Sequence, residues 1–169
     1  MTVVLVTGVA RYLGAHLARR LAEDSRIDRV IGVDAVTPSG DIAAALDDVD
    51  VLTLDLRTPG LLRVLVDAQV EAVAHVAIAT APEQHAGGRA AMKEHNVIGA
   101  MQLLAACQQA PRLRKLVMRS STAAYGASFR DPAIFTEDTE PRAIPRGGFA
   151  KDVLDIESYV RGFRRRIPT

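Results

Sequence analysis

The sequence predicts an α/β fold of the doubly wound type, in which helices cover both faces of a parallel sheet. Short apolar segments of strand length alternate with longer segments whose apolar residues recur at helical spacing. Most of the short segments are apolar without alternation, which is typical of strands that are buried on both faces. Right-handed crossovers then predict the strand order 3-2-1-4-5.

The elements follow in order along the chain. Strands are expected at residues 2–7, 30–34, 51–55, 72–77 and 115–120, and helices at 12–25, 42–46, 59–68, 89–109 and from 149 onward. The third helix can begin at Pro59, which a first helical turn tolerates, and the long helix ends before Pro111. Residues 121–148 are rich in Pro, Gly, Thr and Asp and are expected to form loops, which at this length are commonly functional.

Composition fits one domain over residues 1–169 and limits the partners. The hydrophobic content is 49%, enough for a sizeable core, and the net charge is +1 from 21 basic and 20 acidic residues. Such a balance creates no field that would attract nucleic acid or an anionic membrane. No segment approaches the roughly 18 apolar residues of a membrane span, and the first strand lacks the basic region of a signal peptide. We therefore expect a cytoplasmic protein without nucleic-acid or membrane partners.

Cysteine and histidine give no sign of a metal site. Cys107 is the single cysteine, which excludes an intramolecular disulfide and fits a small core residue in a reducing compartment. His75 lies in an apolar strand, where a hydrogen-bonded core histidine is the favoured interpretation. The other histidines show no paired metal-ligand spacing with it. No metal is expected.

The turn after the first strand carries the clearest functional signal. Gly8 and Gly14 bound this turn, and a helix follows it. The free N–H groups and the positive dipole end of a helix N-terminus favour a pyrophosphate. Asp34 closes the second strand, where a carboxylate can accept both hydroxyls of an adenosine ribose. Together these residues predict a dinucleotide site.

One glycine of the usual three-glycine pattern is absent from this turn. Its middle position, where glycine lets the backbone approach the phosphates, is Arg11. We expect Arg11 to pair with the pyrophosphate, and the alternative is that it reaches the ribose 2′-position. A surface arginine in an ordinary strand-to-helix turn is the simplest interpretation of Arg11 alone. The strand, the helix and Asp34 favour the dinucleotide site.

Seven short motifs resemble a known family when they are taken together and in order. They are Thr7-Gly8 to Gly14, Val33-Asp34, Leu54-Asp55-Leu56, His75-Val76-Ala77, Asn96-Val97-Ile98-Gly99, Ser120 to Gly126, and Phe149-Ala150-Lys151. They cover nearly the whole chain. On these motifs the chain resembles the N-terminal half of the NAD-dependent epimerase/dehydratases, the extended short-chain dehydrogenases. Within that group it is most similar to the UDP-glucose 4-epimerase-like proteins of actinobacteria.

The resemblance implies a Rossmann fold with NAD as cofactor. It assigns the pyrophosphate turn to Gly8, Tyr12, Leu13 and Gly14, the ribose to Asp34, the adenine edge to Asp55 and Leu56, the cofactor channel to Ala77, and a bracing role beside the active-site helix to Asn96. It also implies that the chain is incomplete at its C-terminal end relative to the family. The last strands and the substrate domain would follow residue 169.

The catalytic residues implied by the resemblance are Ser121, Thr122 and Lys151. Ser121, with Thr122 beside it, would hydrogen-bond the substrate hydroxyl, while Lys151 would hold the nicotinamide ribose and lower the pKa of a tyrosine four residues earlier. That position is Gly147, and no Tyr-x-x-x-Lys occurs in the sequence. A phenol matters because it can give and take a proton. Tyr125 is the nearest phenol by sequence, although packing in its turn is the favoured interpretation.

Three hypotheses of function stay open at this point. The chain is an NAD-binding family member that acts on a nucleotide-sugar hydroxyl by reversible hydride transfer, with its enzymatic activity in doubt because of Gly147. Alternatively, it is a non-catalytic NAD-binding sensor, scaffold or partner subunit, or a relative of the steroid-type alcohol dehydrogenases. With later strands missing, strand 115–120 would be an exposed edge, so we expect a homo-oligomer or a completing partner chain.

Overall fold

The computed structural model describes residues 1–82, 87–126, 132, 134–139 and 147–164. The chain folds into two compact units. The first unit comprises Met1–Ile78 and Gly99–Arg119, and the second comprises Ala79–Ile98 and Ser120–Thr169. The expectation of a single domain over residues 1–169 stays a prediction.

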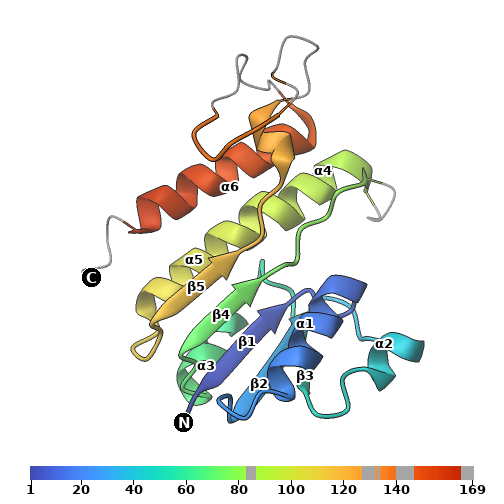
Figure 1. Ribbon diagram of the computed structural model, residues 1–169, viewed down its shortest axis with the longest axis vertical. Coiled ribbons are helices and arrows are strands. Elements are labelled where there is room, and N and C mark those ends of the chain that lie inside the picture. Colours follow the sequence, from blue (N-terminus) through green and yellow to red (C-terminus); the bar gives the residue numbers. More distant parts are fainter. Residues whose placement is uncertain (83–86, 127–131, 133, 140–146, 165–169) are drawn as a thin grey trace. The chain divides into compact units, whose positions relative to one another are not determined.

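The first unit contains a parallel sheet of five strands in the order β3-β2-β1-β4-β5, which confirms the predicted fold class and strand order (Figure 1). The strands are β1 Val3–Thr7, β2 Arg29–Asp34, β3 Asp50–Thr53, β4 Ala72–His75 and β5 Lys115–Met118. The last three end two residues earlier than the sequence pattern predicts. The polar and small residues after them belong to the loops at the carboxyl edge of the sheet.

Burial along the strands follows their position in this sheet. All five residues of the central strand β1 are buried, whereas all four residues of β3 are exposed. The prediction of strands covered on both faces is therefore right for β1 and wrong for β3, because β3 lies at an edge. β5 is the other edge strand of the described sheet, and its Val117 is 53% exposed.

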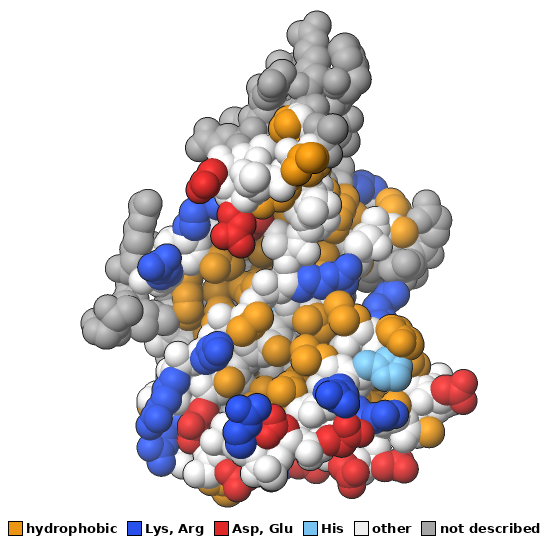
Figure 2. Space-filling model, viewed as in Figure 1, with side chains coloured by type: hydrophobic (Ala, Val, Ile, Leu, Met, Phe, Trp, Pro, Cys, Tyr) orange, Lys and Arg blue, Asp and Glu red, His pale blue; other side chains and the backbone are white. Residues whose placement is uncertain are grey.

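Four helices belong to the first unit. They are α1 Tyr12–Ala22, α2 Gly40–Ala44, α3 Gly60–Asp67 and α5 Gly99–Gln109. In Figure 1, α1 lies on one face of the sheet and α3 and α5 lie on the other, as a doubly wound fold requires. Ala15 and Ala18 of α1 are buried against the sheet, which lets this helix approach closely. Figure 2 shows Lys and Arg interspersed with Asp and Glu over the visible face of this unit.

The second unit contains α4 Gly88–Lys93, the π-helical turn η2 Glu94–Ile98, the 3₁₀ turn η3 Thr122–Tyr125 and α6 Gly148–Arg164. Two expectations are corrected here. The uniform helix predicted over residues 89–109 is interrupted by η2, and the predicted loop over 121–148 begins with η3. Residues 127–131, 133 and 140–146 of that loop lie outside the described residues.

Candidate functional site

The turn after β1 is closed by two glycines that no other residue can replace without a clash. Gly8 has a φ of +84°, and a Cβ there would lie 2.9 Å from the Cα of Ala77. A Cβ on Gly14 would lie 2.1 Å from the carbonyl oxygen of Gly8. The turn, the first turn of α1 and the segment that follows β4 are therefore packed backbone against backbone. This is the close approach that a phosphate-binding turn requires.

Asp34 joins this turn to the end of β2. One carboxylate oxygen accepts a hydrogen bond from the backbone N–H of Ala10 at 3.0 Å, and the other accepts from Val36 at 3.1 Å. The side chain is half-buried, so these amides hold the carboxylate in one orientation without covering it. A carboxylate has about four acceptor positions. Asp34 therefore retains acceptor capacity for the hydroxyls of a ribose.

The N-terminus of α1 presents the three exposed residues that follow the turn. Arg11 is the N-cap, in extended conformation, and its carbonyl accepts from the N–H of Ala15 at 2.9 Å. Tyr12 is 73% exposed and Leu13 48%, while the ring of Tyr12 contacts that of His16. The first turn has neither an acidic residue nor a side chain that caps it. Its N–H groups and dipole thus suit an anionic group.

Three further residues of the predicted cofactor site also lie in the first unit. The carboxylate of Asp55 accepts from the backbone N–H and from the guanidinium of Arg57, at distances of 2.5 to 3.0 Å. Leu56 is a core residue with 7% exposure, and Ala77 lies against Gly8. The adenine contacts of Asp55 and Leu56 and the channel role of Ala77 stay predictions.

Asn96 belongs to the second unit, where it lies in η2. Its side chain is 1% exposed and makes two hydrogen bonds with one residue, accepting from the N–H of Ala79 and donating to its carbonyl, both at 2.9 Å. The pair of bonds fixes the chain segment that follows β4. The π-helical turn thus contains a buried, hydrogen-bonded amide, and the bracing role of Asn96 stays a prediction.

Ser121 and Thr122 begin the 3₁₀ turn η3, which packs against α6. The hydroxyl of Ser121 accepts from the N–H of Ala123 at 3.2 Å, so this side chain caps η3. Thr122 is exposed. The ring of Tyr125 stacks on Phe135 with a centroid distance of 5.2 Å, which supports the packing interpretation of Tyr125. The substrate contacts of Ser121 and Thr122 stay predictions.

Lys151 lies in the first turn of α6, and its ammonium forms an ion pair with Asp155 one turn further along. Gly147 precedes the helix and is exposed, and a Cβ there would meet no atom of the described residues within 4 Å. Among the described residues, nothing therefore fills the position that the family pattern gives to a catalytic tyrosine. Glycine supplies no proton donor there.

Thr7 and His75 form a buried polar pair inside the sheet. They are register partners on β1 and β4, and the hydroxyl of Thr7 lies 2.8 Å from Nδ1 of His75. Their exposures are 0% and 1%. The prediction that His75 is a hydrogen-bonded core histidine is confirmed.

Cys107 is also a core residue, as predicted. It is 3% exposed in α5, and burial raises the pKa of its thiol to about 12. Among the residues that the structure describes, no group of three or more His, Cys, Asp or Glu side chains could hold a metal ion. No helix in the described ranges is long and apolar enough to cross a membrane.

Sequence reasoning missed the pair formed by Arg89 and Asp152 in the second unit. Asp152 is fully buried, and its carboxylate receives two hydrogen bonds of 2.7 Å from the guanidinium of Arg89. A signal was present, because Asp152 stands four residues before Ile156 on the buried face of α6. A charge on an apolar stripe requires a partner. No pattern in the sequence identifies Arg89 as that partner.

The chain is similar to known proteins over almost its whole length. The model of the NAD dependent epimerase/dehydratase family matches residues 4–167. An uncharacterized protein of Mycobacterium tuberculosis is 48% identical over 167 residues, which are 98% of this chain and 44% of that protein. The D-erythronate dehydrogenase of Cupriavidus necator is 29% identical over 184 residues, covering 98% of this chain and 54% of the enzyme. The chain thus spans about half the length of the curated relatives that it matches.

Solved structures agree with the fold. A UDP-glucose 4-epimerase from Bifidobacterium longum in complex with NAD⁺ and UDP superposes with a TM-score of 0.81 at 22% identity, covering 99% of this chain and 50% of the enzyme. Other neighbours with bound NAD include a dTDP-glucose 4,6-dehydratase from Bacillus anthracis. The family match over residues 4–167 is decisive: the chain belongs to the NAD dependent epimerase/dehydratase family.

Proposed function

We propose that this chain binds NAD(H) through the turn after β1, with Asp34 as the group that selects NAD(H) over NADP(H). The observation that carries the proposal is the Asp34 carboxylate, which the N–H groups of Ala10 and Val36 hold beside the turn. A carboxylate there suits two ribose hydroxyls, whereas a 2′-phosphate would meet like charge. Gly8 and Gly14 pack so closely that neither position has room for a Cβ, and such a tight turn supports the same site.

Arg11 is part of this proposal as a ligand of the pyrophosphate. Its backbone begins α1, the helix whose N-terminus would face that group. A guanidinium can form two parallel hydrogen bonds with phosphate oxygens. Arg11 would in this way compensate for the glycine that the turn lacks.

The proposed substrate class is a nucleotide sugar. We also propose that this chain catalyses the reaction poorly or not at all. NAD, when bound, supplies the acceptor for a hydride, but a residue must also take the hydroxyl proton. Gly147 cannot do so, and the stacking of Tyr125 on Phe135 speaks against that phenol as a replacement. Gly147 therefore favours a second candidate function, an NAD-binding module or subunit without catalysis of its own. A cytoplasmic location and self-association or a completing partner chain are part of the proposal.

Calorimetric titration with NAD⁺ and NADP⁺ tests the binding site. The wild-type chain should bind NAD⁺ more tightly, Asp34→Ala should narrow the gap between the two cofactors, and Arg11→Gly should weaken both alike. Asp41→Ala, which removes an exposed acid from α2, is the matched control and should change neither affinity. Tighter binding of NADP⁺ by the wild type, lost in Arg11→Gly, would instead make Arg11 the reader of a 2′-phosphate.

A further inference from the structure

Arg89 and Asp152 form an ion pair in the second unit that the assigned site residues do not explain. Nη1 and Nη2 of Arg89 donate to the two carboxylate oxygens of Asp152, each at 2.7 Å. The Asp152 side chain is 0% exposed and that of Arg89 35%. Charge-assisted bonds of this paired kind fix direction as well as distance, and a buried carboxylate is costly without them. Arg89 therefore determines where the start of α6 can lie within this unit.

A third hydrogen bond extends this control to the first residue of the helix. Nη2 of Arg89 also donates to the carbonyl oxygen of Gly148, at 2.7 Å. Gly148 has a φ of +74° and follows Gly147, so two adjacent residues at this helix start lack a side chain. Glycine loses more conformational entropy on ordering than any other residue. The first turn of α6 also lacks an acidic residue that would stabilise it through the helix dipole.

We propose that Arg89 is a positioning residue that orders the first turn of α6 and thereby orients Lys151. Lys151 directly precedes Asp152, so the bonds that fix Asp152 and Gly148 fix the backbone on both sides of it. The ordering of the turn rests on the contacts of the second unit alone. The orientation of Lys151 matters only under the proposed function, in which the ammonium of Lys151 binds the nicotinamide ribose.

The ordering of the turn is tested by amide hydrogen exchange on the whole chain. Arg89→Lys keeps the charge for Asp152 but loses the planar fork. The amides of residues 152–155, which by helix geometry bond to the carbonyls of the first turn, should therefore exchange about tenfold faster or more, while those of α1 stay unchanged. Arg161→Lys is the matched control, because Arg161 forms an exposed pair with Glu157 on the same helix. Unchanged protection in Arg89→Lys, or an equal loss in both units, would overturn the proposal.

Asp152→Asn provides a second variant if Arg89→Lys does not fold. It removes the charge but retains one oxygen that can accept from Arg89. Faster exchange confined to the amides of residues 152–155, which bond to the carbonyls of the first turn, supports the proposal, and unchanged exchange at these amides contradicts it.

The consequence for Lys151 is tested by binding of NADH and of ADP, which lacks the nicotinamide ribose. Arg89→Lys should weaken NADH binding several-fold and leave ADP binding unchanged. Equal affinities of wild type and variant for both probes would refute the role in orienting Lys151, as would an equal weakening of both. If the wild-type chain binds neither probe, the proposed function fails, while the exchange experiment still decides the ordering of the turn.

Discussion

Two pairs of glycines, one in each unit, meet opposite structural demands. In the first unit, Gly8 and Gly14 are enclosed by backbone atoms, and a Cβ on Gly14 would lie 2.1 Å from a carbonyl oxygen. In the second unit, a Cβ on Gly147 or Gly148 would meet no atom of the described residues within 4 Å. The first pair is required by packing. Packing against the described residues does not require the second pair.

The contrast separates cofactor binding from proton transfer in this chain. The geometry of the phosphate turn depends on backbone contacts, so its glycines cannot change without altering the fold. The proton donor of the family pattern would depend on one side chain at position 147, where a Cβ would meet no described atom within 4 Å. A chain of this kind can lose the catalytic group and retain the nucleotide turn.

The largest predicted effect compares Gly14→Ala with Gly147→Ala. Gly14→Ala should lower the free energy of unfolding by more than about 3 kcal/mol, because the clash is with backbone that cannot move aside cheaply. Gly147→Ala should change it by less than about 0.5 kcal/mol, as is usual for an exposed position. Urea unfolding of both variants measures the difference. Similar losses of unfolding free energy in the two variants would contradict the proposed difference between the two pairs of glycines.

A second comparison separates packing from backbone strain. Gly8 and Gly148 both have positive φ angles, +84° and +74°, but among the described residues a Cβ would strike a neighbour at Gly8 and not at Gly148. Gly148→Ala should cost about 1–2 kcal/mol from the left-handed conformation alone. Gly8→Ala should cost about 1–3 kcal/mol more, because Ala77 must also move. Equal costs in the same unfolding experiment would show that the contact with Ala77 is unimportant.

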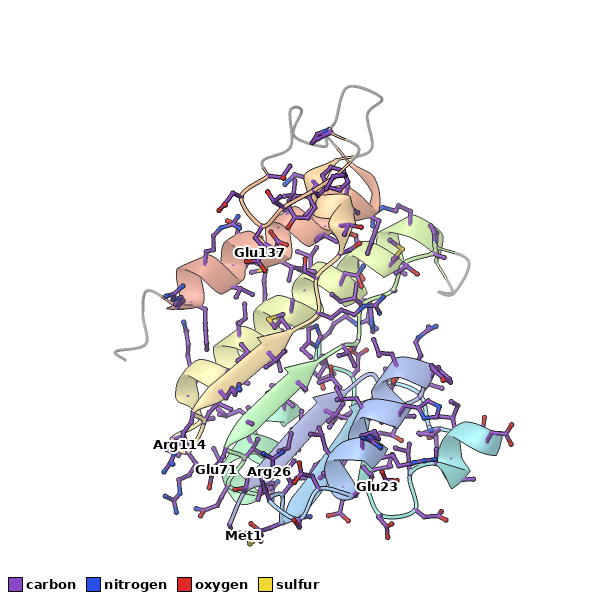
Figure 3. The ribbon with its side chains drawn as sticks, in the orientation of Figure 1. Met1, Glu23, Arg26, Glu71, Arg114 and Glu137 are labelled. Carbon is purple, nitrogen blue, oxygen red and sulfur yellow. The ribbon has the colours of Figure 1, made fainter. Side chains whose placement is uncertain are left out.

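The smallest effect concerns a part of the first unit that lies away from the turn. Figure 3 shows Arg26 at the end of the sheet where Met1 and Glu71 lie, before the strands begin. Hydrogen bonds from Arg26 lower the pKa of Asp24 from 3.8 to about 2. The pair therefore stabilises the fold above pH 3.8, and this contribution is lost as the pH falls toward 2.

Titration of the Asp24 carboxyl by NMR measures this pKa directly. In Arg26→Gln the midpoint should return toward 3.8. NAD⁺ affinity should be unchanged, because the turn precedes the first residue of α1 whereas Asp24 and Arg26 follow its last. High salt should weaken the effect, since both side chains are accessible to solvent. A midpoint that is the same in wild type and variant would contradict the assignment of the shift to Arg26.

Sequence reasoning predicted the fold and the glycine-bounded turn after β1 correctly, because both depend on local patterns. Apolar strand segments and helical periodicity define the order of elements, and the spacing from Gly8 to Gly14 to Asp34 reflects one continuous strand, turn, helix and strand. It did not predict the π-helical turn, in which Asn96 forms two hydrogen bonds with Ala79, a residue outside the helix.

The partnership of Arg89 and Asp152 was missed for a similar reason. These residues are 63 positions apart, and only their tertiary contact gives either of them a role. A buried charge can be suspected from its place on an apolar stripe, but its partner depends on how the helices pack. Long-range pairs of this kind cannot be read from the periodicity of a single segment.

The central claim, that this chain retains the nucleotide turn and lacks the proton donor, is tested most directly by turnover. UDP-galactose should be incubated with the purified chain and NAD⁺ at a concentration that calorimetry shows to be saturating. We predict no formation of UDP-glucose above background, since a positioned acid–base group typically contributes about 10² to 10⁴-fold and Gly147 provides none. Robust NAD-dependent epimerisation that Ser121→Ala abolishes would contradict the claim.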